Sequence, residues 1–257
     1  MASTLLSTTN LKIAHSNGTL LSRDNTKINR SNKGYGESPR YFAKIQHFAP
    51  AKESGYEVCA NRSPGCSAAC LYTAGHGVYD NVKEARIKRT LLFFQDRQKY
   101  KKELIREIGN FVKLCRKKER LPAVRLNGTS DIIWEKIFPE LFELFPDVQF
   151  YDYTKHVARF NKSWVLPKNY HLTFSKSETN NREVNQVLRN GGNVAVVFEK
   201  LPKTYKEKRG RFTKRLKVID GDKSDFRFLD KKNVIVGLTA KGAARKDQSG
   251  FVVLGRN

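Results

Sequence analysis

Three of the four cysteines lie within twelve residues, in the segment CANRSPGCSAACLYTAGHG. Cys59, Cys66 and Cys70 are separated by six and three residues, and a Pro-Gly pair bends the chain between them. Thiolates this close in sequence can converge on a small volume and bind a metal ion or an iron–sulfur cluster. We therefore predict that these three sulfurs hold one inorganic centre.

The spacing leaves the identity of that centre open. Zinc needs a fourth ligand, for which His76 is the nearest candidate. A 4Fe–4S cluster held by three thiolates keeps one iron open, and an open iron that binds S-adenosylmethionine beside a partial barrel is the radical-SAM arrangement. The gaps of six and three differ from the CxxxCxxC spacing usual in that superfamily. Three reduced thiols packed under a loop remain the structural alternative, and Cys115 is predicted to belong to the core.

Alternating strand and helix patterns must position this segment. Helices are predicted at 83–118, 132–145 and 181–190, and strands near 44–48 and at 123–127, 148–153, 170–174, 193–199, 216–220 and 233–239. Such alternation predicts a mostly parallel sheet, and the apolar runs VAVVF and VIVGL indicate strands covered by helices on both faces. An open doubly wound sheet and a barrel both fit. We favour an α/β fold with an incomplete β/α barrel of five to six mostly parallel strands and a β-hairpin insertion.

Polar residues recur where the predicted strands end, which favours the barrel because active sites of β/α barrels lie at that rim. We expect the following residues to contact S-adenosylmethionine or the substrate: Asn127, Thr129, Ser130, Asp131, Thr154, Lys155, Ser175 and Ser177. Glu178 and Lys241 are candidate acid–base groups or substrate clamps, with a salt bridge at the rim as the alternative. The acidic run Asp220–Asp225 could bind Mg²⁺ or Ca²⁺, although a polar turn is the commoner explanation.

The charge of the chain suggests a polyanionic partner. The 49 Lys and Arg exceed the 25 Asp and Glu, which gives a net charge of +24. Much of the excess lies at 83–120 and 200–217, so nucleic acid is the expected partner, with a solvated basic face as the alternative. The candidate phosphate contacts are Lys99, Lys101, Lys102, Arg106, Arg209, Arg211, Lys214 and Arg215.

Composition and motifs exclude several other classes. Hydrophobic residues make up 39% of the chain, enough for a core, and no apolar stretch approaches the length of a membrane helix. We expect a flexible arm at 1–35, a single domain at 36–257 with its Cys-rich loop at 59–77, and a cytosolic setting. The chain contains no GxGxxG, no GxSxG and no Gly-Lys-Ser/Thr phosphate loop, so nucleotide hydrolysis and triad chemistry are not expected.

Several linked motifs resemble one family. The order of the Cys segment, VRLNGTSDIIWE, FPDVQFYDYTKH, LPKNYHLTFSKSE, GGNVAVVFE and VIVGLTAKGAARKDQSGFV is similar to an uncharacterised group of tailed-phage proteins typified by gene product 88. The resemblance covers residues 35–253. It implies the cytoplasm of an infected bacterium as the setting and supports treating the three cysteines as one site, but it brings no established reaction.

Two functions follow as expectations. The first is a phage-encoded iron–sulfur protein, radical-SAM-like if it is an enzyme, whose substrate could be a nucleic acid. The second is a basic nucleic-acid-binding protein in which a zinc or iron–sulfur site is only structural. A barrel that keeps the cluster but has lost the reaction is not distinguished from the first by the sequence.

Overall fold

A computed structural model describes residues 19–22, 41–209 and 212–255. Residues 19–22 lie against helix α4 (Arg97–Lys117), where the backbone N–H groups of Leu20 and Leu21 donate to the carboxylate of Glu107. Both leucine side chains are buried in the core. The remainder of the arm predicted at 1–35 lies outside the described residues.

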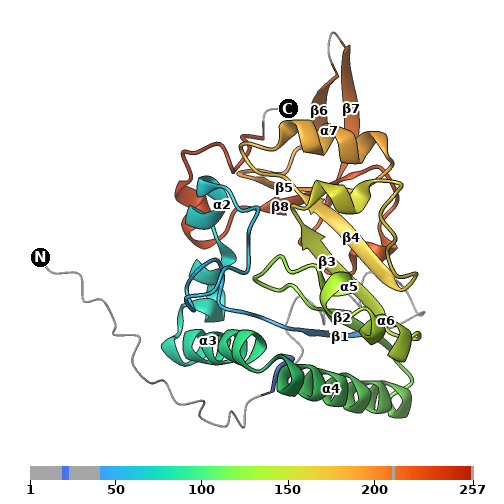
Figure 1. The fold of residues 1–257 in the computed structure, drawn as a ribbon. Coiled ribbons are helices and arrows are strands. Elements are labelled where there is room, and N and C mark those ends of the chain that lie inside the picture. Colours follow the sequence, from blue (N-terminus) through green and yellow to red (C-terminus); the bar gives the residue numbers. More distant parts are fainter. Residues whose placement is uncertain (1–18, 23–40, 210–211, 256–257) are drawn as a thin grey trace, which may run out of the picture.

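The strands form one mixed sheet in which all but the last strand of the order run parallel. Its order is β1 (Tyr41–Ile45), β2 (Leu121–Arg125), β3 (Gln149–Thr154), β4 (Tyr170–Ser175), β5 (Val194–Phe198), β8 (Ile235–Thr239), β7 (Phe212–Asp220) and β6 (Thr204–Arg209). The α/β class and the mostly parallel sheet are therefore confirmed. Strands β1 and β6 form the two edges, so the sheet is not closed (Figure 1).

The predicted number of five to six strands was wrong, and the incomplete barrel is not confirmed. The sheet has eight strands because the predicted hairpin insertion belongs to it. Strand β7 is nine residues long, so it pairs with β6 along Phe212–Lys217 and then, through Val218–Asp220, lies parallel to β8. The weak periodicity of the basic stretch hid this second role of the strand.

Two predicted helices are each divided in the structure. The helix expected at 83–118 consists of α3 (Asp80–Gln95) and α4, separated by Asp96, whose side chain accepts a hydrogen bond from the backbone N–H of Lys99. The helix expected at 132–145 consists of α5 (Trp134–Ile137) and α6 (Glu140–Leu144), separated at Pro139. An acidic N-cap and a proline each begin a new helix more readily than they continue one.

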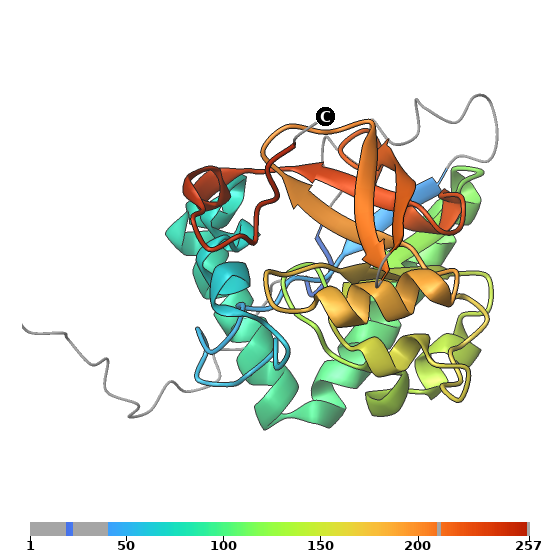
Figure 2. The ribbon, with the colours of Figure 1, turned by 90° about the horizontal axis from the view of Figure 1, so that it is seen from above.

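The two faces of the sheet are covered differently. Helices α4, α5, α6 and α7 (Asn181–Arg189) pack on one face (Figures 1 and 2). On the opposite face, the segment between β7 and β8 places Phe226 against Ala43, Ala123 and Tyr151. The prediction of helices on both faces was wrong, because an aromatic loop takes the place of the second helical layer.

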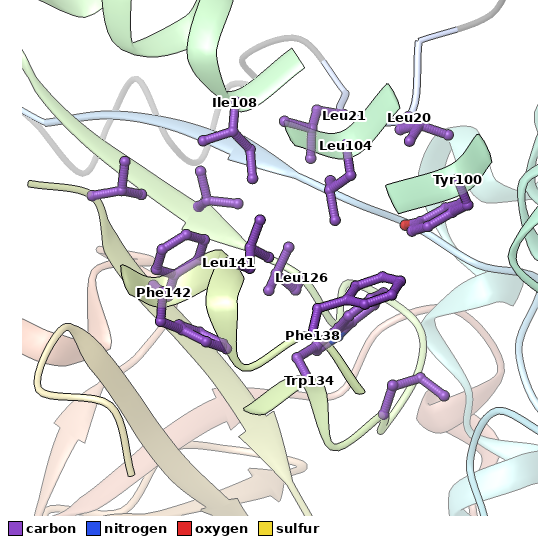
Figure 3. Packing of buried hydrophobic residues seen from close by; sticks show 14 of the residues in the cluster. Leu20, Leu21, Tyr100, Leu104, Ile108, Leu126, Trp134, Phe138, Leu141 and Phe142 are labelled. Atoms are coloured by element: carbon purple, nitrogen blue, oxygen red, sulfur yellow. The ribbon is translucent and has the colours of Figure 1, made fainter. Parts of the chain in front are cut away.

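The helical face carries the main core (Figure 3). Tyr100, Leu104 and Ile108 recur at four-residue spacing along α4 and are buried, as the sequence predicts. Cys115 continues this face and is fully buried, so its assignment to the core is confirmed. Trp134 of α5 lies among these side chains, and its indole N–H donates to Asn127 at 3.0 Å. The core therefore fixes the loop that follows β2, where the candidate site begins.

Candidate functional site

A cavity of about 240 Å³ opens at the carboxyl ends of the parallel strands. Its walls come from the ends of β2 to β5 and β8, from the turn after β7, from the segment that follows β8 and from the segment that joins β1 to α3. Eleven of the residues singled out from the sequence line it: Cys59, Cys66, Cys70, Asn127, Thr129, Ser130, Asp131, Thr154, Lys155, Ser175 and Lys241. Ser177 and Glu178 do not line it.

The three cysteines reach this cavity from positions before, within and after the short helix α2 (Pro64–Ala68). Ser63 is the N-cap of α2, and its hydroxyl accepts a hydrogen bond from the backbone N–H of Cys66 at 3.1 Å. Pro64 occupies the first turn, where a missing N–H costs nothing. This local Ser-Pro sequence therefore ends the extended chain after Cys59 and begins the turn that carries Cys66.

Glu178 holds this turn in place. One carboxylate oxygen accepts a hydrogen bond from the Ser63 hydroxyl at 2.7 Å, and the other accepts one from the Gly65 backbone N–H at 2.8 Å. A side chain at Gly65 would come within 2.8 Å of the side chains of Glu178 and Ser249, which would then have to move. These bonds lower the pKa of Glu178 against the effect of its burial. The structure thus gives Glu178, a predicted acid–base group, an anchoring contact to the cysteine segment.

The thiols of Cys59, Cys66 and Cys70 are free and half-buried. Burial raises the pKa of Cys59 to about 12, and the charges of Asp131, Cys70 and Cys66 act in the same direction. Burial also raises the pKa of Cys70, while the nearby cations Arg86 and Lys155 oppose the rise. Burial therefore favours the protonated thiol at Cys59 and at Cys70.

The donor set is of the kind that soft metals take. Three thiolates in one cavity suit zinc or an iron–sulfur cluster. Within the described part of the chain, no group of three or more His, Cys, Asp or Glu side chains is placed to hold a single metal ion. Ligands of a four-iron cluster bind different irons, so they stand farther apart than the ligands of one ion. His76, the predicted fourth zinc ligand, lies in the turn Gly75–Val78 and packs against Tyr79, outside the cavity lining.

The loop after β2 is organised by its own side chains. The side-chain oxygen of Asn127 accepts hydrogen bonds from the Ser130 hydroxyl, the Ile132 backbone N–H and the Trp134 indole. The hydroxyl of Thr129 donates to the carbonyl of Phe48 at 2.6 Å. These three predicted ligand contacts, Asn127, Thr129 and Ser130, therefore have structural partners already, and they shape the wall of the cavity.

Asp131 and Lys155 both line the cavity and carry opposite charges. One oxygen of Asp131 accepts the backbone N–H of Lys155 at 2.8 Å, and the other is buried without a hydrogen-bond partner among the described residues. The Lys155 ammonium donates to the hydroxyl of Ser175 at 3.2 Å and pairs with no carboxylate within the described ranges. Opposite charges on two adjacent loops could bind the two ends of a zwitterion.

The other predicted residues have local partners. Lys241 forms an ion pair with Asp222 at the rim of the cavity, which is the salt bridge that the sequence left open. The hydroxyl of Thr154 accepts the backbone N–H of His156, and the backbone N–H of Ser177 donates to Asn180. The carboxylate of Asp222, in the acidic run considered for Mg²⁺ or Ca²⁺, is therefore paired with the Lys241 ammonium.

Two polar strand residues, Arg125 and Asp152, were missed by the sequence analysis. Arg125 and Tyr153 line the cavity, and the guanidinium lies 4.6 Å from the centre of the tyrosine ring. Arg125 also pairs with Asp225 at 3.7 Å. The Nε of Arg125 and the hydroxyl of Tyr153 are buried without hydrogen-bond partners among the described residues. An arginine inside the apolar run AVRLN was the available sequence signal.

Asp152 lies behind the cavity and is fully buried. It accepts hydrogen bonds from the Asn127 backbone N–H at 2.6 Å and the Tyr170 hydroxyl at 2.7 Å. Burial raises the pKa of Asp152 to about 7, although these bonds and the charge of Arg125 oppose the rise. The folded state therefore binds a proton that the unfolded state releases near pH 4.

This difference predicts a pH dependence that the neutral variant D152N removes. Stability contributed by protonated Asp152 is present below about pH 4 and is lost as the pH rises towards 7. We expect the free energy of unfolding of D152N, measured relative to the wild type by urea denaturation, to increase between pH 4 and 7. A difference that stays constant over this range would contradict the raised pKa. Burial lowers the pKa of His47 to about 3, which makes the stability of the protein rise with pH over the same range. Because His47 is present in both proteins, its effect cancels in the difference between them.

The two predicted basic surfaces are separate. Lys102 and Arg106 of α4 are exposed, whereas Lys99 is half-buried and Lys101 pairs with Glu140. In the hairpin of β6 and β7, Arg215 is exposed, while Arg209 and Lys214 belong to the paired strands and Arg211 lies outside the described residues. The hairpin projects from the end of the molecule opposite α4 (Figure 1). The two stretches therefore do not form one continuous surface.

These features define a mixed α/β protein with an open, mostly parallel sheet and a cysteine-lined cavity at the carboxyl ends of its strands. The model of the gene product 88 family matches residues 19–255, so the chain belongs to that family. No curated protein and no solved structure matches the chain. Among the described residues, no helix has the length and apolar character required to span a bilayer.

Proposed function

We propose that the protein is an iron–sulfur protein in which Cys59, Cys66 and Cys70 hold a 4Fe–4S cluster at the mouth of the sheet. The observation that carries this proposal is that all three cysteines line one cavity at the carboxyl ends of the strands. Three thiolates supply three of the four ligands that such a cluster takes, which leaves one iron open. The cysteine-free remainder of the cavity then lies next to that open position.

The ligand that we propose for this space is S-adenosylmethionine. Its methionine end carries an ammonium and a carboxylate, which are complementary in charge to the Asp131 carboxylate and the Lys155 ammonium that line the cavity. Apolar side chains of Val197, Leu238 and Phe251 also line the cavity and suit the uncharged part of the molecule. A cluster held by the three cysteines would supply the electron for reductive cleavage of S-adenosylmethionine, while Lys155 and Asp131 would orient the methionine end of the ligand in the cavity.

Reconstitution without oxygen tests both parts of this proposal. We expect the full chain, supplied with iron and sulfide, to become brown, and with dithionite to cleave S-adenosylmethionine into methionine and 5′-deoxyadenosine. A colourless protein contradicts the cluster. A brown protein that neither binds nor cleaves S-adenosylmethionine contradicts the proposed radical-SAM-like activity. In that case only the proposal of an iron–sulfur protein is supported.

Lys155→Met separates ligand binding from cluster binding. The variant removes the ammonium but no thiolate, so we expect unchanged iron content and binding of S-adenosylmethionine weakened roughly tenfold or more, as the loss of one charged hydrogen bond predicts. Equilibrium dialysis with the labelled ligand measures this change. Lys246→Met, an exposed cation outside the cavity lining, is the matched control. Equal affinity in Lys155→Met and the control would contradict the proposed pose.

A second candidate is a nucleic-acid-binding protein with a structural zinc or iron–sulfur site, and nucleic acid could also be the substrate of the enzyme. The net charge of +24 and the exposed cations Lys102, Arg106 and Arg215 favour it. Neutralising a phosphate releases a counterion, so affinity for DNA or RNA should fall with salt. For K102A/R106A we expect the slope of log affinity against log salt to decrease by about 2. Affinity that is flat with salt would exclude this partner.

The family bears on the setting of the protein. If gene product 88 proteins are phage proteins, as the sequence motifs indicate, the protein acts during infection. We therefore propose the cytoplasm of the infected bacterium, where reducing conditions keep the three thiols available.

A further inference from the structure

One wall of the cavity carries a guanidinium and a phenol whose donors are not used within the described fold. Arg125 ends β2 and Tyr153 belongs to β3, and both side chains line the cavity. The guanidinium lies 4.6 Å from the centre of the tyrosine ring. The Nε of Arg125 and the hydroxyl of Tyr153 are buried without a hydrogen-bond partner among the described residues. Two contacting side chains therefore each have a donor without an acceptor in that part of the chain.

Arg159 shows how another buried guanidinium of this fold is satisfied. Its Nε and Nη2 donate to the two oxygens of the Glu135 carboxylate, at 2.9 and 2.8 Å. Arg125 instead has the carboxylate of Asp225 beside its Nη1, at 3.7 Å, which is beyond hydrogen-bond distance. The other oxygen of Asp225 accepts the hydroxyl of Tyr151 at 2.9 Å. The Nε of Arg125 thus lacks the oxyanion that the Nε of Arg159 binds.

A further unused hydroxyl lies on the neighbouring strand. Thr173 of β4 pairs in register with Tyr153, and neighbours in register on parallel strands point to the same face of the sheet. Thr173 is fully buried, and its hydroxyl has no hydrogen-bond partner among the described residues. Buried polar groups are nearly always paired, so three such groups on adjacent strands indicate that an acceptor from outside the chain binds here.

This wall differs from the pair proposed to bind S-adenosylmethionine. The Lys155 ammonium donates to Ser175 and lies 5.9 Å from the centre of the Phe251 ring, in the segment that follows β8. Arg125 lies beside Asp225, in the segment between β7 and β8. The cavity is therefore lined by two cations that contact different segments of the chain.

We infer that Arg125 and Tyr153 form a binding subsite for the carboxylate or phosphate group of an acidic small molecule. A guanidinium can donate to both oxygens of such a group, and the phenol adds one more donor. The two donors are covered by protein atoms, and their side chains contact through the ring, so a small movement of the ring admits the oxygens. The inference goes beyond the proposed function, because this binding requires neither a cluster nor S-adenosylmethionine.

Nuclear magnetic resonance of the full chain, reduced and without iron, tests this subsite. The reporter is the Nε–H signal of Arg125, because a buried donor exchanges slowly with water. The signal is assigned by its absence in Arg125→Lys and by nuclear Overhauser contacts to the Tyr153 ring. We expect inorganic phosphate or acetate, titrated at constant ionic strength against chloride, to shift this signal until it saturates. The anion that binds more tightly distinguishes a phosphate-bearing ligand from a carboxylate-bearing one.

Tyr153→Phe removes the hydroxyl and keeps the ring beside the guanidinium. We expect this variant to bind the anion roughly tenfold more weakly, as the loss of one hydrogen bond to a charged group predicts. Tyr79→Phe removes an exposed hydroxyl outside the cavity lining and is the matched control, with wild-type affinity expected.

The outcomes separate this inference from the proposed function. An Arg125 signal that neither anion shifts overturns the subsite and assigns the two donors to water, and this titration of the wild type decides even if a variant fails to fold. Equal affinity in Tyr153→Phe and Tyr79→Phe also overturns it. A chain that binds no iron overturns the proposed function alone, because anion binding is measured without iron.

Discussion

Replacing Cys66 by alanine is expected to abolish the bound iron of the anaerobically reconstituted protein. Cys66 lies in α2 between the other two cysteines that line the cavity, and its removal leaves two thiolates, too few to retain a cluster. Cys59→Ala and Cys70→Ala should have the same effect, because the three sulfurs are proposed to act as one site. Iron and sulfide analysis of the desalted proteins measures the loss.

Cys115→Ala is the matched control for these variants. Cys115 is fully buried in the core face of α4 and does not line the cavity. We expect it to retain all iron and to lose about 1 kcal/mol of stability, because a small buried side chain is truncated. Loss of iron in Cys115→Ala to the same extent as in Cys66→Ala would show that the iron is not held by the predicted trio.

Glu178→Ala is expected to release the cysteine segment. The substitution removes both acceptors that hold Ser63 and Gly65, and we expect this to destabilise the local fold by about 1–2 kcal/mol, given that the carboxylate is partly solvated. The iron content after reconstitution should fall to half or less of the wild-type value, and limited proteolysis should cleave within 59–77 before other segments. Protease fragments identified by mass spectrometry report the site of cleavage.

Glu178→Gln distinguishes an anchor from an acid–base group. The amide oxygen can still accept the Gly65 N–H, and the amide nitrogen can donate to the Ser63 hydroxyl, so we expect wild-type iron content and unchanged proteolysis. Cleavage of S-adenosylmethionine should also be unchanged. A variant with full iron content and no turnover would restore the catalytic role that the sequence suggested.

The sequence predicted the parts of the fold that depend on local pattern. The strands around VAVVF and VIVGL are recognisable because their apolar runs are buried in a parallel sheet. The rule that the carboxyl ends of parallel strands meet at one edge predicts that Asp131, Lys155 and Ser175 lie together, and the structure places all three at one cavity. The amphipathic spacing of α4 likewise marked its buried face.

What the sequence could not supply depends on contacts between distant segments. The partner of β7 changes from β6 to β8 within one strand, and no local pattern records that change. Asn127 looked like a ligand contact, but its side chain is occupied by hydrogen bonds to Trp134 and to Asp152, which lies 25 positions away. Glu178 looked like a catalyst because it ends a strand, whereas its function in the fold is set by residues 113 to 115 positions earlier.

The central claim, that three cysteines hold one iron–sulfur centre, is tested most directly by elemental analysis of the full chain purified without oxygen. The account predicts about four irons and an equal amount of acid-labile sulfide per chain, as a 4Fe–4S cluster requires. One zinc per chain without sulfide, or a metal-free protein with three reactive thiols, would contradict it.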